Sequence, residues 1–299
     1  MTSIAPSVAP ADRKGLGAGL LCYTLWGLLP LLFHAAERAG AGPLEIVAWR
    51  TLFSVPLALG LVLWVDRGAA LKALLLQPKN LLALLLSAVL IAINWIVYVW
   101  AVNSGHVITA SLGYYINPLL NMAAGAVLFR ERIDRFGIVA IALAAAGVVV
   151  QGLALGEFPW VALILAFSFA GYGIVRKQAK ADAQTGLLVE CLILAVPALI
   201  YAGWTVGHGQ GAFGHSVAPT LLLILCGPAT VIPLALFAFA ARRLPLTVVG
   251  FLQFIAPTLQ FMVGLWQGEA MTPLRALSFV FIWAGVMVFG VGAWKRSRR

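Results

Sequence analysis

The sequence predicts an all-α integral membrane protein of ten transmembrane helices, arranged as two inverted five-helix repeats with both termini in the cytoplasm. Three observations predict this class. The composition is too apolar for a water-soluble globule, the basic residues alternate between the ends of apolar segments, and one proline motif recurs in the second half of the chain.

The composition indicates a membrane protein. Of the 299 residues, 62% are hydrophobic and 10% are charged, whereas a soluble domain carries about 25% charged residues. So many apolar residues cannot all be buried inside a soluble globule. The net charge of +10 does not indicate a nucleic-acid partner, because the basic residues lie at the ends of apolar segments. The cysteines lack paired spacing, so neither a disulfide framework nor a metal site is expected.

Ten apolar segments each come near the roughly 17 to 25 residues that a bilayer requires. Glycine, proline and charged clusters separate them. They cover residues 16–35, 44–65, 80–102, 107–129, 136–153, 159–175, 187–204, 217–241, 246–266 and 274–294. Residues 1–14 are expected to form a disordered cytoplasmic N-terminus, and residues 295–299 a basic cytoplasmic tail. No signal-peptide cleavage pattern follows the first segment, so we expect it to remain as an anchor.

The lysine and arginine residues predict the orientation. If the N-terminus is cytoplasmic, seventeen of the 20 fall in inner segments. Arg38 and Arg275 fall in outer segments, and Arg50 lies within the second helix. Because inner loops of membrane proteins are enriched in these residues, both termini are expected inside.

A proline motif recurs in the two halves. Tyr115-Ile-Asn-Pro118 precedes Glu131 by a spacing close to that between Phe254-Ile-Ala-Pro257 and Glu269. A proline inside an apolar helix frees a carbonyl group and bends the axis, so Pro118 and Pro257 are candidate hinges. Matched bends in two halves indicate a transporter built from a duplicated unit.

The register of the two halves continues past the glutamates, because Gly147 and Gly285 each lie sixteen residues further on. The repeats are therefore predicted at 15–153 and 156–294. Five helices per repeat is an odd number, so the second copy enters the membrane in the opposite orientation. A substrate site is expected near the midplane between them.

Longer stretches carry a family resemblance: SLGYYINPL, INWIVYVWAVN, AFSFAGYGIVRK, AQTGLLVE and GFLQFIAPTLQF. They resemble the RarD group of the EamA family, in the drug/metabolite transporter superfamily, over nearly the whole chain. The group is named for a link to chloramphenicol sensitivity. The resemblance implies two EamA repeats, a bacterial inner membrane and a transport role, but no particular substrate. Trp49 stands where a histidine is usual and Thr109 where a glutamate is common, so no proton relay is carried over at these positions.

Two ionisable residues lie inside predicted spans, where charge is costly and marks function unless the side chain reaches an interface. Arg50, the only base within a span, lies about 9 Å from the outer end of its helix, and Glu190 about 5 Å from the inner end of its own. In a hydrocarbon core about 30 Å thick they are about 15 Å apart, so no direct salt bridge is expected. Arg50 is predicted to contact substrate, and Glu190 is the candidate carrier of a coupled proton.

Polar and aromatic residues are predicted to line a mostly apolar cavity between the halves. Besides Arg50, the substrate-binding candidates are Trp26, Asn94, Tyr98, Tyr115, Asn117, Ser168, Tyr172 and Gln253. A wider set adds Trp95, Trp100, Asn103 and Ser111. The alternative is that the aromatic residues form interface belts and that the asparagine and serine residues bond neighbouring helices.

The function that these patterns predict is secondary transport or export of a small organic compound, such as a metabolite, an amino acid or a drug like chloramphenicol, by alternating access. No P-loop, HExxH or GxSxG motif supports an ATPase or hydrolase. The alternative is a membrane-embedded enzyme acting on a lipid-like substrate, which would need clustered acids or histidines. The expected partners are the substrate and the lipid bilayer, with a proton as candidate coupling ion and a homodimer as candidate assembly. No cofactor, metal or nucleic acid is expected.

Overall fold

The computed structural model describes residues 12–297 except 66–67, 130–133, 157 and 245. Glu131, part of the motif on which the predicted repeats rest, and most of the segment expected to be disordered lie outside the described residues. Within them, α1 begins at Arg13 because the Asp12 carboxylate caps it, accepting hydrogen bonds from the backbone N–H groups of Lys14 and Gly15.

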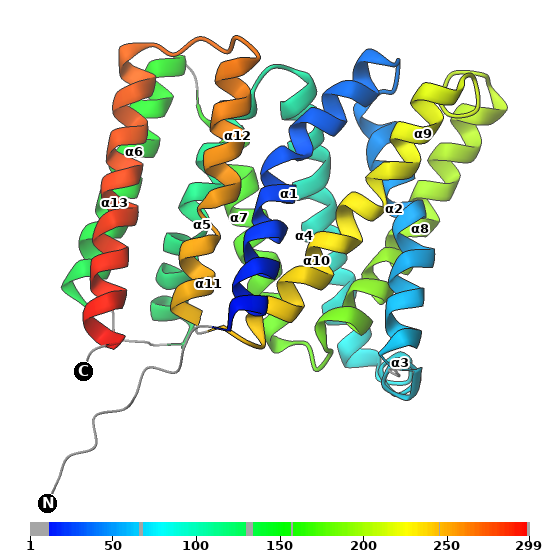
Figure 1. Cartoon of the computed structure of the whole chain (residues 1–299), viewed down its shortest axis with the longest axis horizontal. Helices are drawn as coiled ribbons and strands as arrows, with labels where there is room; N and C mark the ends of the chain where they lie inside the picture. Colours follow the sequence, from blue (N-terminus) through cyan, green and yellow to red (C-terminus); the bar gives the residue numbers. More distant parts are fainter. Residues whose placement is uncertain (1–11, 66–67, 130–133, 157, 245, 298–299) are drawn as a thin grey trace, which may run out of the picture.

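The described residues form helices joined by short connections (Figure 1). The helices are α1 (Arg13–Arg38), α2 (Pro43–Trp64), α3 (Gly68–Leu75), α4 (Pro78–Asn103), α5 (Val107–Phe129), α6 (Arg135–Leu155), α7 (Trp160–Gln178), α8 (Ala183–Gly207), α9 (Val217–Cys226), α10 (Pro228–Ala241), α11 (Leu246–Leu252), α12 (Ile255–Trp266) and α13 (Pro273–Ser297).

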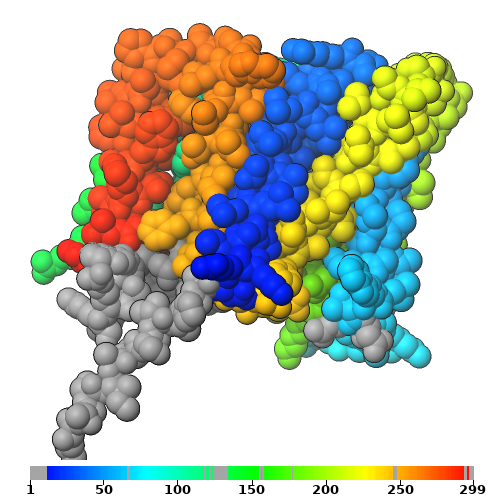
Figure 2. Space-filling model, viewed as in Figure 1, coloured from blue at the N-terminus to red at the C-terminus, as the bar shows by residue number. Residues whose placement is uncertain are grey.

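Among the described residues, 8 helical segments are long and apolar enough to cross a membrane. They are Arg13–Arg38, Pro43–Trp64, Pro78–Asn103, Arg135–Ala154, Ala183–Gly207, Val217–Ala241, Val248–Trp266 and Pro273–Gly292, with a shorter apolar helix at Trp160–Arg176. Large apolar side chains on their outer faces are exposed, including Leu153, Ile200 and Val217. On the face that the space-filling view shows, α12, α1 and α10 lie side by side (Figure 2). An apolar exterior is typical of a surface covered by lipid.

Two segments that the sequence predicted as single helices are each divided. The segment 217–241 breaks between α9 and α10, where Pro228 is the first residue of α10. The segment 246–266 breaks at Gln253 and Phe254, and Pro257 is the third residue of α12. A proline cannot donate to the carbonyl group four residues earlier, and its ring clashes with that group. For Pro257 that carbonyl belongs to Gln253, within the break itself. The short α3 was not predicted.

The helices pack in matched pairs. Helix α1 of the first half packs on α10 and α12 of the second half. Helix α7 of the second half packs on α4 and α5 of the first half. Three further pairs, α2 with α8, α5 with α12 and α6 with α13, join corresponding helices of the two halves. In the α6–α13 pair, a Cβ atom at Gly147 would lie 3.0 Å from the Ser278 carbonyl oxygen, and one at Gly285 would lie 3.0 Å from that of Ala140. Both glycines therefore permit close contact between these backbones.

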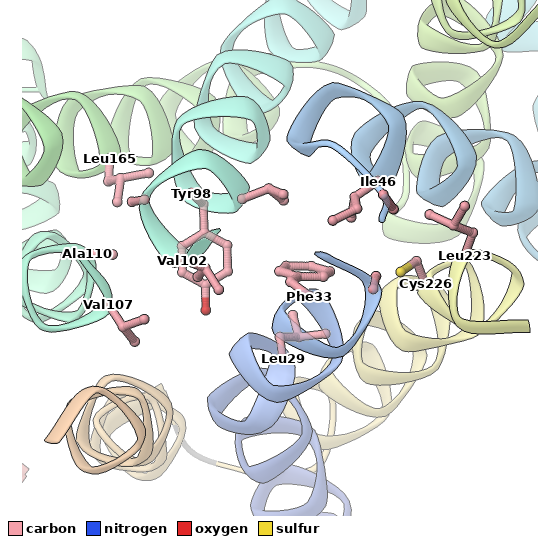
Figure 3. Close-up of a cluster of buried hydrophobic side chains, with 14 of the residues drawn as sticks. Leu29, Phe33, Ile46, Tyr98, Val102, Val107, Ala110, Leu165, Leu223 and Cys226 are labelled. Carbon is pink, nitrogen blue, oxygen red and sulfur yellow. The ribbon is translucent and has the colours of Figure 1, made fainter. Parts of the chain in front are cut away.

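The start of α1 and the end of α13 lie at one end of the bundle, called here the terminal end (Figure 1). A large cluster of buried apolar side chains lies at the opposite end, called here the closed end. Its members come from α1, α2, α4, α5, α7 and α9, and from the connections that hold Ala41 and Ala212. Figure 3 shows Phe33 beside Tyr98 in this cluster, and their ring centroids are 6.0 Å apart. The cluster joins helices from both halves.

Candidate binding cavity

A cavity of about 360 Å³ lies between the two halves of the bundle. Its lining comes from α1, α2, α4 and α5 of the first half and from α7, α8, α10 and α12 of the second. Most of the sequence-predicted candidates line it: Trp26, Arg50, Asn94, Tyr98, Asn117, Tyr172, Glu190, Gln253 and Pro257. From the wider set, Trp95 also lines it.

Tyr115 and Ser168 are not among the lining residues. The Tyr115 hydroxyl lies 2.6 Å from the Thr258 hydroxyl, and its ring packs against Phe254 and Phe279. Tyr114 lines the cavity instead, because one step along a helix rotates a side chain by about 100°. Tyr115, which the sequence placed in the lining, therefore lies outside the lining of this cavity. The Ser168 hydroxyl lies 3.0 Å from the Asn94 side-chain nitrogen and so supports a lining residue from behind.

The side chain of Pro118 lies outside the described part of the structure, although the range of α5 includes this position. From the wider set, Trp100 packs against His106 and Trp160, and Ser111 donates to the Ile108 carbonyl within α5. Neither residue lines the cavity, and the Ser111 bond lies within its own helix and does not reach a neighbouring one.

Arg50 is buried in α2, with 5% of its surface exposed. Its Nε atom donates to the Thr230 hydroxyl at 2.6 Å, and its guanidinium carbon lies 4.2 Å from the centroid of the Trp95 ring. Its Nη1 atom is buried and has no hydrogen-bond partner among the described residues. A side chain so buried does not reach an interface, so Arg50 does not snorkel.

Glu190 lies deeper than its sequence position suggested. The predicted helix began at residue 187, but α8 begins at Ala183 because the Asp182 side chain caps it by accepting from the Thr185 N–H at 2.9 Å. Glu190 is therefore seven residues into its helix and 2% exposed. The predicted distance of about 5 Å from the inner end of the helix was too short, because the helix begins at a cap outside the apolar run.

Glu190 is also fully partnered. Ser87 donates to its Oε1 at 2.5 Å, and the Tyr172 hydroxyl donates to its Oε2 at 3.3 Å. The Arg176 Nε atom lies 3.6 Å from Oε1. Arg176 lies just beyond the predicted segment 159–175, but α7 continues to Gln178, so this arginine extends from a helix. Among the described residues, no ion pair joins Arg50 to Glu190, as the sequence predicted.

Arg176 reaches Glu190 because of a glycine. A Cβ atom at Gly186 would overlap the Arg176 guanidinium group, so the arginine side chain takes this position because residue 186 is glycine. The Arg176 Nη2 atom also donates to the Asp182 carbonyl at 3.2 Å. The sequence contained the arginine and the glycine, but nothing in it indicated that they meet.

Several buried polar atoms of the lining lack hydrogen-bond partners among the described residues. Besides Arg50 Nη1 they are the Tyr98 hydroxyl, both amide atoms of Asn117, Gln260 Oε1 and Arg176 Nη1. Buried polar groups in proteins are nearly always bonded, and each one left unsatisfied costs about 1–3 kcal/mol. Their gathering around one cavity indicates a site for a molecule with polar substituents.

Comparison with known proteins identifies the family. A profile of the EamA-like transporter family matches residues 13–152. An uncharacterized transporter of Pseudomonas aeruginosa is 40% identical over 292 residues, which cover 96% of this chain and 96% of that protein. Protein RarD of Escherichia coli strain K12 is 38% identical and covers 97% of this chain and 98% of that protein. The chain belongs to the EamA-like transporter family.

Membership in the EamA family confirms the resemblance that the sequence showed and makes the chain a multi-pass membrane protein of a transporter family, not of an enzyme family. The enzyme alternative is therefore set aside. A solved crystal structure of a protein shares the fold, with a TM-score of 0.62 at 18% identity, covering 93% of this chain and 97% of that one.

The cavity of this EamA protein extends toward the terminal end. Leu61 and Ala238 lie three residues from the last residues of α2 and α10, and Ala183 is the first residue of α8. Toward the other end, the lining stops at Leu29 and Tyr98, where the closed-end cluster begins. The cavity is thus covered on one side by packed side chains from both halves.

A buried carboxylate joins the two halves at the closed end. Glu45 of α2 is 3% exposed and accepts hydrogen bonds from the Ala212 N–H at 2.8 Å and the Phe213 N–H at 3.0 Å. A Cβ atom at Gly211 would lie 2.8 Å from the Glu45 Oε1 atom, so the approach depends on that glycine. Trp49 stacks on Phe213 with ring centroids 3.7 Å apart. Sequence reasoning missed Glu45, because its partners lie 167 residues away.

A second carboxylate makes a similar connection. Glu269, just beyond α12, accepts from the N–H groups of Val107 and Ile108 at the start of α5, the latter at 3.1 Å. A carboxylate at a helix N-terminus satisfies free N–H groups and the helix dipole. Burial raises the pKa of Glu269, and these two backbone bonds act against the rise. Glu45 and Glu269 are called here the closed-end carboxylates.

Proposed function

We propose that this EamA protein is a secondary transporter or facilitative exporter of a small organic compound, which it binds in the cavity between two inverted five-helix repeats. The observation that carries the proposal is the cavity itself. It has about 360 Å³ of space, a lining drawn from both halves, and a buried guanidinium group with an unused donor. Binding cavities in transporters of this kind lie between the repeats.

The repeats comprise α1, α2, α4, α5 and α6, within residues 15–153, and α7, α8, α9–α10, α11–α12 and α13, within residues 156–294. The matched helix pairs support this division. When each helix is replaced by its counterpart in the other repeat, the pair of α1 and α10 becomes that of α7 and α4, and the pair of α1 and α12 becomes that of α7 and α5. Both resulting pairs are observed, and the other three pairs join counterparts and so stay the same. In this assignment ten spans cross the membrane, and α1 begins at the end where α13 finishes, as an even number of spans requires.

The terminal end faces the cytoplasm of a bacterial cell in this proposal, with the spans in the inner membrane. Basic residues support the orientation, since those near the terminal end include Arg13, Lys14, Lys72, Lys79, Arg135, Lys180, Arg242, Arg243 and Lys295. The closed end has Arg38 and Arg275. Such a bias is typical of the cytoplasmic side. The conformation described here is then the one in which the cavity extends toward the cytoplasm.

Transport requires the closed end to open while the terminal end closes. Pro257 supports a hinge at this point, because it lines the cavity directly after the break between α11 and α12. Pro118 occupies the matching place in the first repeat. Glu190 is the candidate carrier of a coupled proton, since it is a buried acid whose three partners come from α4 and α7. Movement of either helix would change its hydrogen bonds.

Uptake into liposomes by the purified protein tests the proposal. A panel of metabolites, amino acids and amphenicol drugs would be measured with and without a pH gradient. Ala235 lines the cavity, so Ala235→Trp should fill it and stop uptake. Ala145→Trp, on an exposed face of α6, is the matched control and should transport normally. Unchanged uptake by the Ala235→Trp protein would show that substrates do not pass through this cavity.

A further inference from the structure

The charges of the cavity do not balance. The charged residues among its described lining are Arg50, Arg176 and Glu190. Arg176 and Glu190 lie against each other, with Nε and Oε1 3.6 Å apart. Among the described residues, Arg50 contacts the neutral Thr230 hydroxyl and the rings of Phe33 and Trp95. The Arg50 charge therefore has no negative partner among the described residues.

A buried charge without a counter-charge is expensive in a membrane protein and generally faces a partner or a cavity. The Thr230 hydroxyl and the Trp95 ring offset only part of this cost, because neither carries a negative charge. Arg50 has five N–H donors in a planar fork. Its Nε atom is used and its Nη1 atom has no partner among the described residues. A guanidinium group with unused donors can bind the two oxygens of a carboxylate.

We propose that the transported compound is a small organic monoanion, a carboxylate on a planar apolar body, whose carboxylate pairs with Arg50. The inference rests on the proposed function, and it names the substrate class of that cavity. The volume of about 360 Å³ lies at the lower end of the range for ligand pockets, which suits a compound of one or two rings.

The aromatic lining accounts for the planar body. Tyr98 and Tyr114 meet edge to face with ring centroids 5.4 Å apart, and Tyr23 and Trp26 do so at 5.6 Å. All four line the cavity, as does Trp95 beside the Arg50 guanidinium. Flat rings fit such walls by stacking and edge contacts. The free amide groups of Asn117 and Gln260 would bind a hydroxyl or carbonyl substituent.

The same charges disfavour amines. Glu190 is the acid among the described lining residues. Its oxygens already accept hydrogen bonds from Ser87 and Tyr172 and form an ion pair with Arg176. A ligand ammonium group would meet neutral acceptors and the positive charge of Arg50 in the same cavity. A neutral compound would leave the Arg50 charge without a partner. Both should bind more weakly than the acid of the same shape.

Matched probes test the substrate class. Benzoate, phenylacetate and indole-3-acetate would each be compared with the corresponding neutral amide, by the rise in melting temperature of the purified wild-type protein and by competition for radiolabelled ligand. Phenethylamine and phenylalanine serve as the cationic and zwitterionic probes. At least one acid should stabilise the protein and bind tenfold or more tightly than its amide, about 1.4 kcal/mol. This comparison needs no variant to fold.

Variants then assign the preference to Arg50. Arg50→Met should abolish the difference between acid and amide. Arg50→Lys should lose about tenfold in affinity for the acid, because lysine keeps the charge but not the fork. Lys72→Met removes an exposed charge from α3 and should leave the preference unchanged.

The proposal would be overturned if no acid bound better than its amide, if phenylalanine or phenethylamine bound better than every acid, or if a folded Arg50→Met protein kept the preference. If one of these results were obtained, but the wild-type protein took up other compounds and the Ala235→Trp variant did not, the proposed transport function would hold and only the carboxylate substrate class would be rejected.

Discussion

Arg50 and Glu190 occupy matching places in the two halves of the bundle. Each lies seven residues after the first residue of its helix, in α2 and α8. Each is bonded by a hydroxyl group from the other half, Arg50 by Thr230 and Glu190 by Ser87. Their charge environments differ, because Glu190 is paired with Arg176 and Arg50 has no anion beside it among the described residues. The two matching positions therefore differ in charge and in partners. Arg50 is suited to bind an anion, and Glu190 is suited to carry a proton.

Glu190→Gln tests the coupling role. Glutamine keeps the shape and can still accept from Ser87, but it cannot take up and release a proton. If Glu190 carries the coupled proton, accumulation driven by a pH gradient should fall at least tenfold, while exchange of labelled for unlabelled substrate continues. Both rates would be measured in the same liposomes. Glu37→Gln, which changes a more exposed acid, should leave both rates unchanged. Gradient-driven accumulation at the wild-type rate would remove Glu190 from coupling.

Glu45→Gln tests the closed-end carboxylates. The amide replaces a charged acceptor of two backbone N–H groups, and such hydrogen bonds contribute about 1.5–3 kcal/mol each. The closed end should therefore open more often. Cys226 is wholly buried in the closed-end cluster and reports the opening. With Cys22 and Cys191 replaced by serine, its rate of labelling by a thiol reagent should rise about tenfold or more.

Glu269→Gln should act in the same direction, because it weakens the contact with the start of α5. Glu37→Gln again serves as the control. Labelling of Cys226 at the same rate in wild-type and both variants would show that these carboxylates do not hold the end closed.

Pro118→Ala and Pro257→Ala test the hinges. Each change should allow another backbone hydrogen bond and straighten a helix. Both proteins should insert and fold normally but transport several times more slowly. Pro197→Ala is the matched control, since Pro197 also lies inside a helix, α8, but on an exposed face. Transport at the wild-type rate by the double variant would mean that the two bends serve packing alone.

Single cysteines test the orientation. Cysteines replacing Ser104 and His215, which are exposed at the closed end, should react with an impermeant thiol reagent added outside intact cells. A cysteine replacing Gln178, exposed at the terminal end, should not react. Gly211 is unsuitable as a site, because any Cβ there would meet Glu45. The opposite pattern of labelling would reverse the proposed orientation and the direction in which the cavity opens.

The residues that line the cavity could be predicted better than their contacts. Arg50, Asn94 and Asn117 are polar residues in apolar runs, so the sequence alone predicted that they face the interior of the bundle. The sequence did not predict which of Tyr114 and Tyr115 lines the cavity, because both lie in the same apolar run. The rotation of α5 against its neighbours decides which one faces the cavity. The depth of Glu190 likewise depended on a cap at Asp182.

The sequence by itself determined the family, the apolar segments that form the spans, the matched motifs around Pro118 and Pro257, and the burial of Arg50. These follow from the transfer of each segment into lipid, which depends on the residues of that segment. The tertiary structure alone decided that Arg176 pairs with Glu190, that Glu45 binds the backbone near Ala212, and that Arg50 has no anionic partner among the described residues. Such contacts join helices far apart in the chain. Which groups meet depends on the close packing of those helices, including the space that Gly186 and Gly211 leave for a neighbouring side chain.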